Sequence, residues 1–262
     1  MKPQSRVPLG YEEYEGDRQF ATTLARGMQL LRCFSTDTLE LGNKELANML
    51  RLPAATVSRL TYTLLCMGYL TQSKNYGKYR LGNKILVLGS PLLESYRIRT
   101  RARPLMWQLA KETGGTVAIG VRDQMGIVCI EAIRADNNRL YRMDVGEVRP
   151  LIGTALGRAC LMSCQKDERM QILNQIQIRS PEDWQRFGEA TMANIKQFAR
   201  HGCCTNVGEL YPDVQAVAVP MGRIDQDEPA SLSCSFQGVK LDASWLRETI
   251  APKLISLIRE IG

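Results

Sequence analysis

One face of a predicted helix carries side chains that could read the bases of DNA. The helix begins at Pro53, and Val57, Leu60 and Leu64 recur at helical spacing to give it an apolar face. The opposite face offers hydroxyls that can bond phosphates or base edges, small groups that allow close approach, and a guanidinium that can bond one guanine twice. The residues of this polar face are Ala55, Thr56, Arg59, Tyr62 and Thr63.

Two upstream helices would hold this face in position. Asn43 can cap the nearer helix by accepting a backbone N–H, and Leu46 and Leu50 share one side of it. With a turn at residues 51–52, this pair predicts a helix-turn-helix whose second helix fits the major groove of DNA. A helix over Thr22–Phe34 would brace the pair. Its inward-facing residues are predicted to be Leu24, Met28 and Leu31.

A hairpin is predicted directly after the helix-turn-helix. Tyr69–Gln72 and Lys78–Leu81 are short strand-like runs, and residues 73–77 between them have turn chemistry. Lys74 and Lys78 would lie at or beside the tip. A hairpin in this place is typical of a wing that contacts phosphates or the minor groove.

Two sequence runs resemble one family. KELANMLRLPAATVSRLTYTLLCMGYL, followed by KYRLG, is similar to the winged helix of the IclR family of bacterial transcription regulators. RPLIGTALGRACLM resembles the loop and helix that open the effector-binding half of that family, and the two similarities together span about residues 24–262. Arg51 departs from the glycine that the family often has in the turn. A left-handed conformation costs a non-glycine residue about 1 kcal/mol, which predicts a slightly reshaped turn.

Together, the polar face and the resemblance give a set of expected DNA contacts, which are Lys44, Ala55, Thr56, Ser58, Arg59, Tyr62, Thr63, Lys74 and Lys78.

The basic charge is concentrated in the same part of the chain. The net charge of the protein is +7, and Phe20–Arg103 holds thirteen Lys and Arg against four Asp and Glu. Pro104–Gly262 holds eighteen against nineteen. A charge run taken alone is usually a solvated surface. Its coincidence with a helix-turn-helix and a wing instead favours a polyanionic partner, whose binding should weaken steeply with salt.

The cysteines and histidine do not predict a metal site. The eight cysteines include no CxxC pair, and the single histidine is His201. We therefore expect reduced thiols that act as small buried hydrophobes, no metal and no cofactor. Residues 1–16 lack the apolar stretch of a signal peptide, and no run approaches the length of a membrane span. These features predict a cytoplasmic protein without a membrane partner.

Motifs of common enzymes are absent from the sequence. It contains no GxSxG elbow, HExxH, P-loop or GxGxxG, so we expect no enzyme. His201 falls in a last helical turn, where a structural role is favoured. Cys203 and Cys204 could act as redox sensors, but neighbours on a strand face opposite ways and neither has an evident partner that would stabilise a thiolate.

The rest of the chain predicts an α+β second domain with an antiparallel sheet. We expect a flexible arm over 1–19, a winged helix-turn-helix over 20–82, a linker helix over 83–100 and an effector-binding and oligomerisation domain over 101–262. Pro91 should kink or break the linker helix. The predicted strands are Thr116–Val121, Ile127–Ile133, Arg139–Val145, Cys203–Asn206, Val214–Met221 and Ser231–Gln237, and helices begin at Thr154, Ser180 and Asp242. The family resemblance implies a GAF/PAS-like sheet with a small-molecule pocket on one side.

The loop before Thr154 is the predicted start of that pocket. Backbone N–H groups at a helix start suit a carboxylate, and Gly153 allows close approach of a ligand. Arg149 could bind a carboxylate through two parallel bonds, whereas Arg158 is expected to be a structural or surface residue. Asn206 stands where many relatives carry an acid. The residues to which the loop chemistry and the resemblance point are Arg149, Gly153, Thr154, Ala155, Leu156, Asn206, Val214, Ala216, Ser233 and Ser235.

The sequence therefore predicts a transcription regulator that acts as a homodimer or homotetramer on a pseudo-palindromic operator. A small organic acid, with an aromatic catabolite as the favoured class, would change its affinity for the operator. One alternative is a second domain that serves only oligomerisation or contact with a protein partner, and a further alternative is an enzyme that has acquired a DNA-binding domain.

Overall fold

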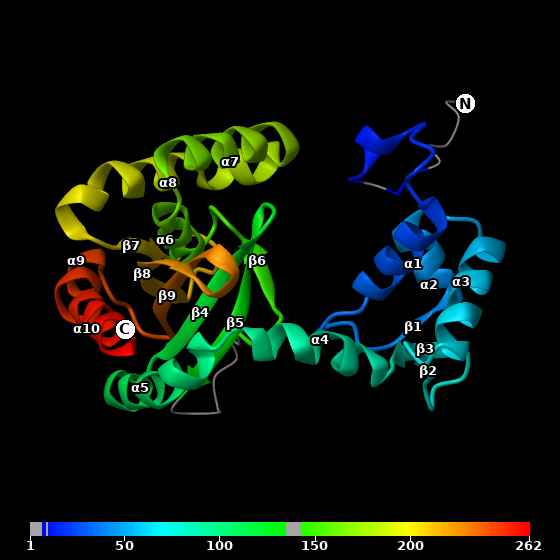
Figure 1. Ribbon diagram of the computed structural model, residues 1–262, viewed down its shortest axis with the longest axis horizontal. Helices are drawn as coiled ribbons and strands as arrows, with labels where there is room; N and C mark the ends of the chain where they lie inside the picture. The colour runs from blue at the N-terminus through cyan, green and yellow to red at the C-terminus, as the bar shows by residue number, and fades with distance from the viewer. Residues whose placement is uncertain (1–6, 9, 135–142) are drawn as a thin grey trace. The chain divides into compact units, whose positions relative to one another are not determined.

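The computed structural model describes residues 7, 8, 10–134 and 143–262, and the chain divides into two compact units after Leu92 (Figure 1). No helix in these described ranges is both long and apolar enough to cross a membrane. Each unit has its own buried core.

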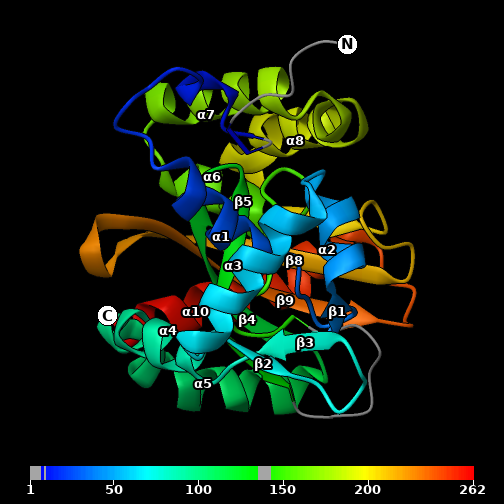
Figure 2. The ribbon, with the colours of Figure 1, turned by 90° about the vertical axis from the view of Figure 1, so that its right-hand side faces the viewer.

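The first unit is a winged helix. Leu30, Leu46, Val57 and Leu70 are buried together at its centre, and the β2–β3 hairpin follows the end of α3 (Figure 2). The strand order is β1-β3-β2, all antiparallel. Its elements are η1 (Glu12–Tyr14), α1 (Thr22–Arg32), β1 (Leu41–Gly42), α2 (Asn43–Leu50), α3 (Ala54–Cys66), β2 (Leu70–Gln72) and β3 (Lys78–Leu81).

The inward face of α1 differs from the prediction. Leu24 and Met28 are 66% and 49% exposed, whereas Leu31 packs against the core as predicted and Leu30 is fully buried. The periodic pattern had two possible faces, and contact with α2 and α3 selects the one that carries Leu30.

The junction of α2 and α3 also differs in detail. Gly42, not Asn43, caps α2, and the Glu45 carboxylate accepts the Gly42 N–H at 2.7 Å. The amide of Asn43 instead bonds Ser58 and Thr61 of α3, which ties the two helices together. Arg51 itself adopts the left-handed conformation, with φ 52° and ψ 41°, so the turn keeps this conformation without glycine and the expectation of a reshaped turn was wrong.

The linker helix predicted over 83–100 ends at Ser95. α4 (Lys84–Ser95) runs through Pro91 without a break there, and the helix is interrupted only at Tyr96 and Arg97, before α5 (Ile98–Thr113). None of the side chains of α4 is buried, and Leu86 is 75% exposed.

The second unit is built on a six-stranded antiparallel sheet with the order β6-β5-β4-β9-β8-β7. A strand forms at Val148–Pro150, where a loop was predicted, because these residues pair with β5. The predicted strand over Arg139–Val145 lies partly outside the described residues, and Met143–Val145 is not a strand. The strands are β4 (Thr116–Asp123), β5 (Gly126–Arg134), β6 (Val148–Pro150), β7 (Cys204–Val207), β8 (Val214–Ile224) and β9 (Glu228–Gln237).

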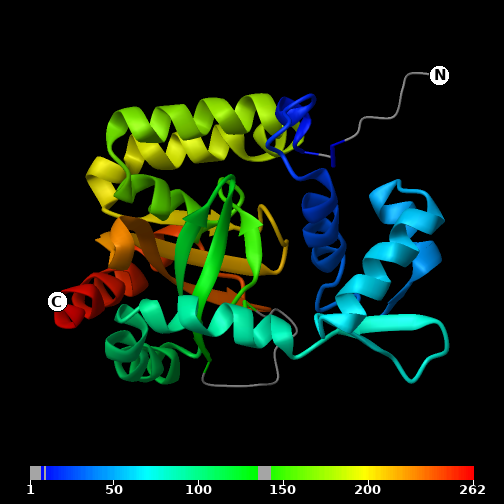
Figure 3. The same ribbon diagram turned by 45° about the vertical axis from the view of Figure 1, so that its right-hand side comes forward.

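Helices cover both faces of this sheet. α5 and α10 pack on one face, while α6 packs on the other, with α7 and α8 side by side beyond it (Figures 1 and 3). α7 was not predicted, whereas the helix starts after Thr154, Ser180 and Asp242 are confirmed. A π-helical turn lies between the helix that begins after Asp242 and the helix that contains Pro252. The helices are α6 (Ala155–Ser163), α7 (Lys166–Arg179), α8 (Pro181–His201), η2 (Asp225–Asp227), α9 (Ala243–Trp245), η3 (Leu246–Ile250) and α10 (Ala251–Ile261).

Candidate functional site

The polar face of α3 is open to solvent. Arg59 and Thr63 are exposed, and Tyr62 is 70% exposed even though an aromatic ring of this size is usually mostly covered. Thr56 is half-buried, and the Thr63 hydroxyl donates to the carbonyl of Arg59 at 2.9 Å. The other candidates on α2 and α3, namely Lys44, Ala55 and Ser58, are exposed.

Hydrogen bonds to Glu40 anchor the tip of the β2–β3 hairpin. The Glu40 carboxylate accepts hydrogen bonds from Ser73 and Asn75, which lower the pKa of Glu40 below its usual value. Lys74 lies exposed in this anchored tip. Lys78 is half-buried, and its ammonium is 3.3 Å from Glu45 of α2, so of the two predicted lysines Lys74 is the more available to an outside phosphate.

The α6 helix is enclosed on all sides. Every residue from Ala155 to Leu161 is buried, and a Cβ on Gly157 would lie 1.9 Å from the carbonyl oxygen of Leu151. The Thr154 hydroxyl accepts the Gly157 N–H at 2.9 Å, which satisfies one of the free amides at the helix start. The loop over 151–153 is therefore clamped against the first turn of α6.

Arg158 joins four segments of the second unit and has no surface exposure. Its guanidinium donates to the carbonyl of Ile152 at 2.9 Å and to the carbonyl of Thr205 at 2.9 Å. It also bonds the hydroxyl of Thr191 and forms a two-point ion pair with Glu209. The expectation of a structural residue is confirmed, and that of a surface residue was wrong.

The strand register brings several candidate residues into one row. Asn206 pairs with Ala216, and Ala216 pairs with Ser235 across β7, β8 and β9. The amide of Asn206 donates to the carbonyl of Gly153 at 2.8 Å, so this row reaches the loop before α6. Val214 stands at the end of the same strand as Ala216.

The three serines of β9 make different contacts. The Ser231 hydroxyl donates to the Leu156 carbonyl at 2.7 Å, and that of Ser235 reaches the Thr116 carbonyl at 3.5 Å. Ser233 pairs with Ala218 and Ala118, and its hydroxyl forms no hydrogen bond with the residues that the structure describes. Small side chains thus surround Ser233 on this face of the sheet.

Arg149 is engaged by its own chain. Its guanidinium pairs with Glu147, donates to the Tyr211 hydroxyl, and lies 5.0 Å from the centre of the Tyr211 ring. Burial raises the pKa of Glu147 above its usual value, although the charge of Arg149 opposes this shift. Arg149 therefore fastens the loop over 208–213, and a ligand carboxylate would have to share it with these partners.

Sequence reasoning missed Thr191, Glu209 and Tyr211, whose roles depend on contacts between distant segments. One local signal was present for Arg158, because Ala155, Gly157 and Ala159 around it are small and indicate a closely packed helix. The described residues contain no group of three His, Cys, Asp or Glu side chains that could hold a metal ion.

Comparison with known proteins gives the same two-part organisation. The family model described as the bacterial transcriptional regulator IclR C-terminal domain matches residues 91–261, and the IclR helix-turn-helix domain matches residues 23–74.

Relatives extend over nearly the whole chain. The crystal structure of an IclR family transcriptional regulator from Brucella abortus is 39% identical, with a TM-score of 0.80, and covers 94% of this chain and 92% of its own. The HTH-type transcriptional regulator TsaQ1/TsaQ2 of Comamonas testosteroni is 30% identical over 91% of this chain and 86% of its own length.

A more distant structure shares the fold. An IclR homologue from Microbacterium hydrocarbonoxydans, solved in complex with 4-hydroxybenzoate, is 19% identical with a TM-score of 0.70 and covers 91% of this chain and 97% of its own. From the two domain matches and the similarity of the Brucella and Comamonas proteins, this chain belongs to the IclR family of transcriptional regulators.

Proposed function

We propose that this regulator binds operator DNA through the exposed face of α3 and the tip of the β2–β3 hairpin. The observation that carries this proposal is the exposure of Arg59 and Tyr62 on a helix whose other side is buried in the first unit's core. Arg59 would bond a base edge and Lys74 a phosphate. The wider set of contacts is the one predicted from the sequence.

The regulator acts in the cytoplasm as a homodimer or homotetramer in this proposal. A single recognition helix contacts only a few base pairs, and joining two of them raises the local concentration of the second. The uncovered apolar side chains of α4 support assembly, because Leu86, Val87, Leu88 and Leu92 are each more than half exposed.

A small organic acid changes the affinity for the operator in the second part of the proposal. The acid would lie between the start of α6 and the row of small residues on β8 and β9. Asn206, Ser233 and Ser235 supply polar groups there, and Ser233 has no partner among the described residues. Because the Microbacterium homologue was solved with 4-hydroxybenzoate, aromatic acids are the first class to test.

Thermal melting against a panel of organic acids at fixed salt tests the pocket. A ligand that binds only the folded state should add about 2.7 kcal/mol of stability at one hundred times its dissociation constant. Wild type should show this shift, Ser233→Ala should lose most of it, and Ser90→Ala, which removes an exposed hydroxyl from α4, should keep it. A shift that Ser233→Ala retains would place the acid elsewhere. If no acid shifts any variant, a second unit that serves only oligomerisation or contact with a protein partner is favoured.

A further inference from the structure

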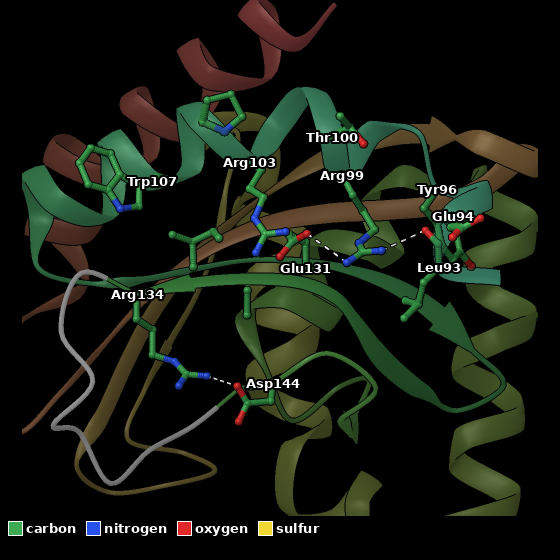
Figure 4. Close-up of a pocket in the computed structure, with 13 residues that line it drawn as sticks. Leu93, Glu94, Tyr96, Arg99, Thr100, Arg103, Trp107, Glu131, Arg134 and Asp144 are labelled. Carbon is green, nitrogen blue, oxygen red and sulfur yellow. Dashed lines mark hydrogen bonds and ion pairs between the residues drawn. The ribbon is translucent and has the colours of Figure 1, made fainter. Parts of the chain in front are cut away.

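A cleft of about 840 Å³ lies between α5 and the end of β5, away from the residues assigned to the pocket beside α6 (Figure 4). α5 contributes Arg99, Arg103 and Trp107, while β5 contributes Glu131, Ile133 and Arg134. We call this feature the α5 cleft. Leu93 and Glu94, in the last turn of α4, also line it.

Most charges in the wall of the α5 cleft are already paired. The Arg99 guanidinium lies 3.3 Å from the Glu131 carboxylate and donates to the Leu93 carbonyl at 3.0 Å. The Glu131 side chain is only 4% exposed. At the other end, Arg134 pairs with Asp144 and donates to the carbonyl of Met143. These bonds fix the wall without leaving a net charge on either pair.

Arg103 and Glu94 are the exceptions among the charged residues that line the cleft. The Arg103 side chain extends from α5 towards Glu131, but it forms no hydrogen bond or ion pair with any residue in the described ranges (Figure 4). Because Glu131 is engaged by Arg99, one deep carboxylate stands opposite two guanidiniums. The Arg103 guanidinium is therefore a positive charge without a partner among these residues, and Arg99 lies between it and the Glu94 carboxylate (Figure 4), so the part of the cleft beside Arg103 favours an anion.

The lining beside Arg103 is apolar. Pro104 and Trp107 follow it on α5, and Ala132 and Ile133 lie across the cleft on β5. Trp107 is 52% exposed, with the Lys111 ammonium 5.2 Å from its ring centre. An apolar strip beside a guanidinium that has no partner among the described residues suits a small molecule that has an apolar body and one carboxylate.

We propose that the α5 cleft is a second small-molecule site that binds an organic monocarboxylate. The carboxylate bonds the Arg103 guanidinium, and the ring or chain of the acid packs on Trp107 and Ile133. The acid would also contact the last turn of α4 at Leu93, the helix that continues from the first unit. The site shares no residue with the pocket proposed beside α6, so an acid can occupy either one independently.

Tryptophan fluorescence and titration calorimetry on the full-length protein test this site with sodium benzoate and sodium hexanoate. Binding should change the fluorescence of wild type, and Trp107→Phe should lose this change while it retains the heat of binding. Arg103→Ala should weaken binding about ten- to hundredfold, the effect of losing one charge-assisted contact. Arg97→Ala, which removes another exposed arginine next to α5, should change it less than about twofold.

Three outcomes would overturn the proposal. The first is that neither acid gives a saturable signal at millimolar concentration. The second is that Arg103→Ala binds the acids as tightly as wild type does. The third is that sodium phosphate competes with them equally well, which would show that the apolar body of the acid adds nothing to binding. Ser233→Ala separates the two sites, because it should leave binding in the α5 cleft unchanged. If Ser233→Ala abolishes the binding of an acid and Arg103→Ala does not, that acid lies beside α6. This result would support the proposed function and contradict the second site.

Discussion

Arg59 and Arg158 have the same side chain and opposite surroundings. Arg59 is exposed on α3, in a unit whose core lies behind it, whereas Arg158 is fully buried in α6 and bonds four other segments. The first unit presents a charge that an outside partner can neutralise. In the second unit, the charge of Arg158 is paired inside the protein, and its hydrogen bonds fix the loop and strands around the proposed pocket. The same residue type thus serves architecture in α6, and in the proposed function it serves DNA recognition in α3.

Removing the internal arginine should have the largest effect on stability. Arg158→Ala leaves Glu209 without its cation and removes the guanidinium donor from the carbonyls of Ile152 and Thr205, so we expect a loss of about 3–5 kcal/mol in the free energy of unfolding of the second unit. Urea denaturation followed by far-UV circular dichroism measures it. Arg59→Ala is the matched control and should stay within about 0.5 kcal/mol. Equal stability of the two variants would remove the contrast between these arginines.

Removing the exposed arginine should instead reduce DNA binding. Arg59→Ala should weaken operator binding by about 1–3 kcal/mol and affect random DNA much less. Lys74→Ala should lower affinity for both DNAs alike and reduce the salt dependence. Fluorescence anisotropy with labelled duplexes at several salt concentrations distinguishes these results. Equal losses for Arg59→Ala on both DNAs would limit it to contact with the phosphate backbone.

The turn between α2 and α3 should show a smaller effect. Arg51 has a left-handed backbone, which glycine adopts without the steric cost of a Cβ atom. Arg51→Gly should therefore be about 1 kcal/mol more stable than Arg51→Ala, which removes the same side chain but keeps the strain. Chemical denaturation of the two variants provides the comparison. An alanine variant as stable as the glycine variant would show that this turn carries no strain.

Thiol labelling should distinguish the two units with the smallest change to the protein. Cys66 on α3 is exposed, whereas Cys129 and Cys204 are buried, and burial raises the pKa of each of these two thiols to about 12. At pH 8, Ellman's reagent should modify Cys66 first, and Cys66→Ser should abolish that fast phase. The buried neutral thiols stabilise the fold below about pH 8.5, and this contribution should fall as the pH rises above that value. Rapid labelling of Cys204 in the native protein would contradict its burial.

Local rules were sufficient for most of the winged helix. The strands at Leu70–Gln72 and Lys78–Leu81 lie within a residue of the prediction, because hairpin turn chemistry and helical periodicity act over short distances. α7 was missed although Ile172 and Ile176 have helical spacing and acidic residues occupy its first turn, so this signal was available.

The remaining differences come from long-range contacts. The strand at Val148–Pro150 exists because β5 offers it a partner, and its three residues carry no strong pattern of their own. Arg158 is buried because Glu209, 51 residues further along the chain, closes over it. The proposed pocket residues rest on the family resemblance and strand alternation, neither of which could show that Arg149 is held by Tyr211.

The contact between Gly157 and Leu151 limits how this protein can be redesigned. Any side chain at position 157 would push α6 away from its loop, and a Cβ on Gly120 would meet Leu156 at 2.7 Å. Gly157 and Gly120 therefore cannot be exchanged for larger residues without moving the start of α6, which forms the helix wall of the proposed pocket. New ligand preference would have to be engineered from the opposite wall, at Ala216, Ser233 and Ser235 on β8 and β9.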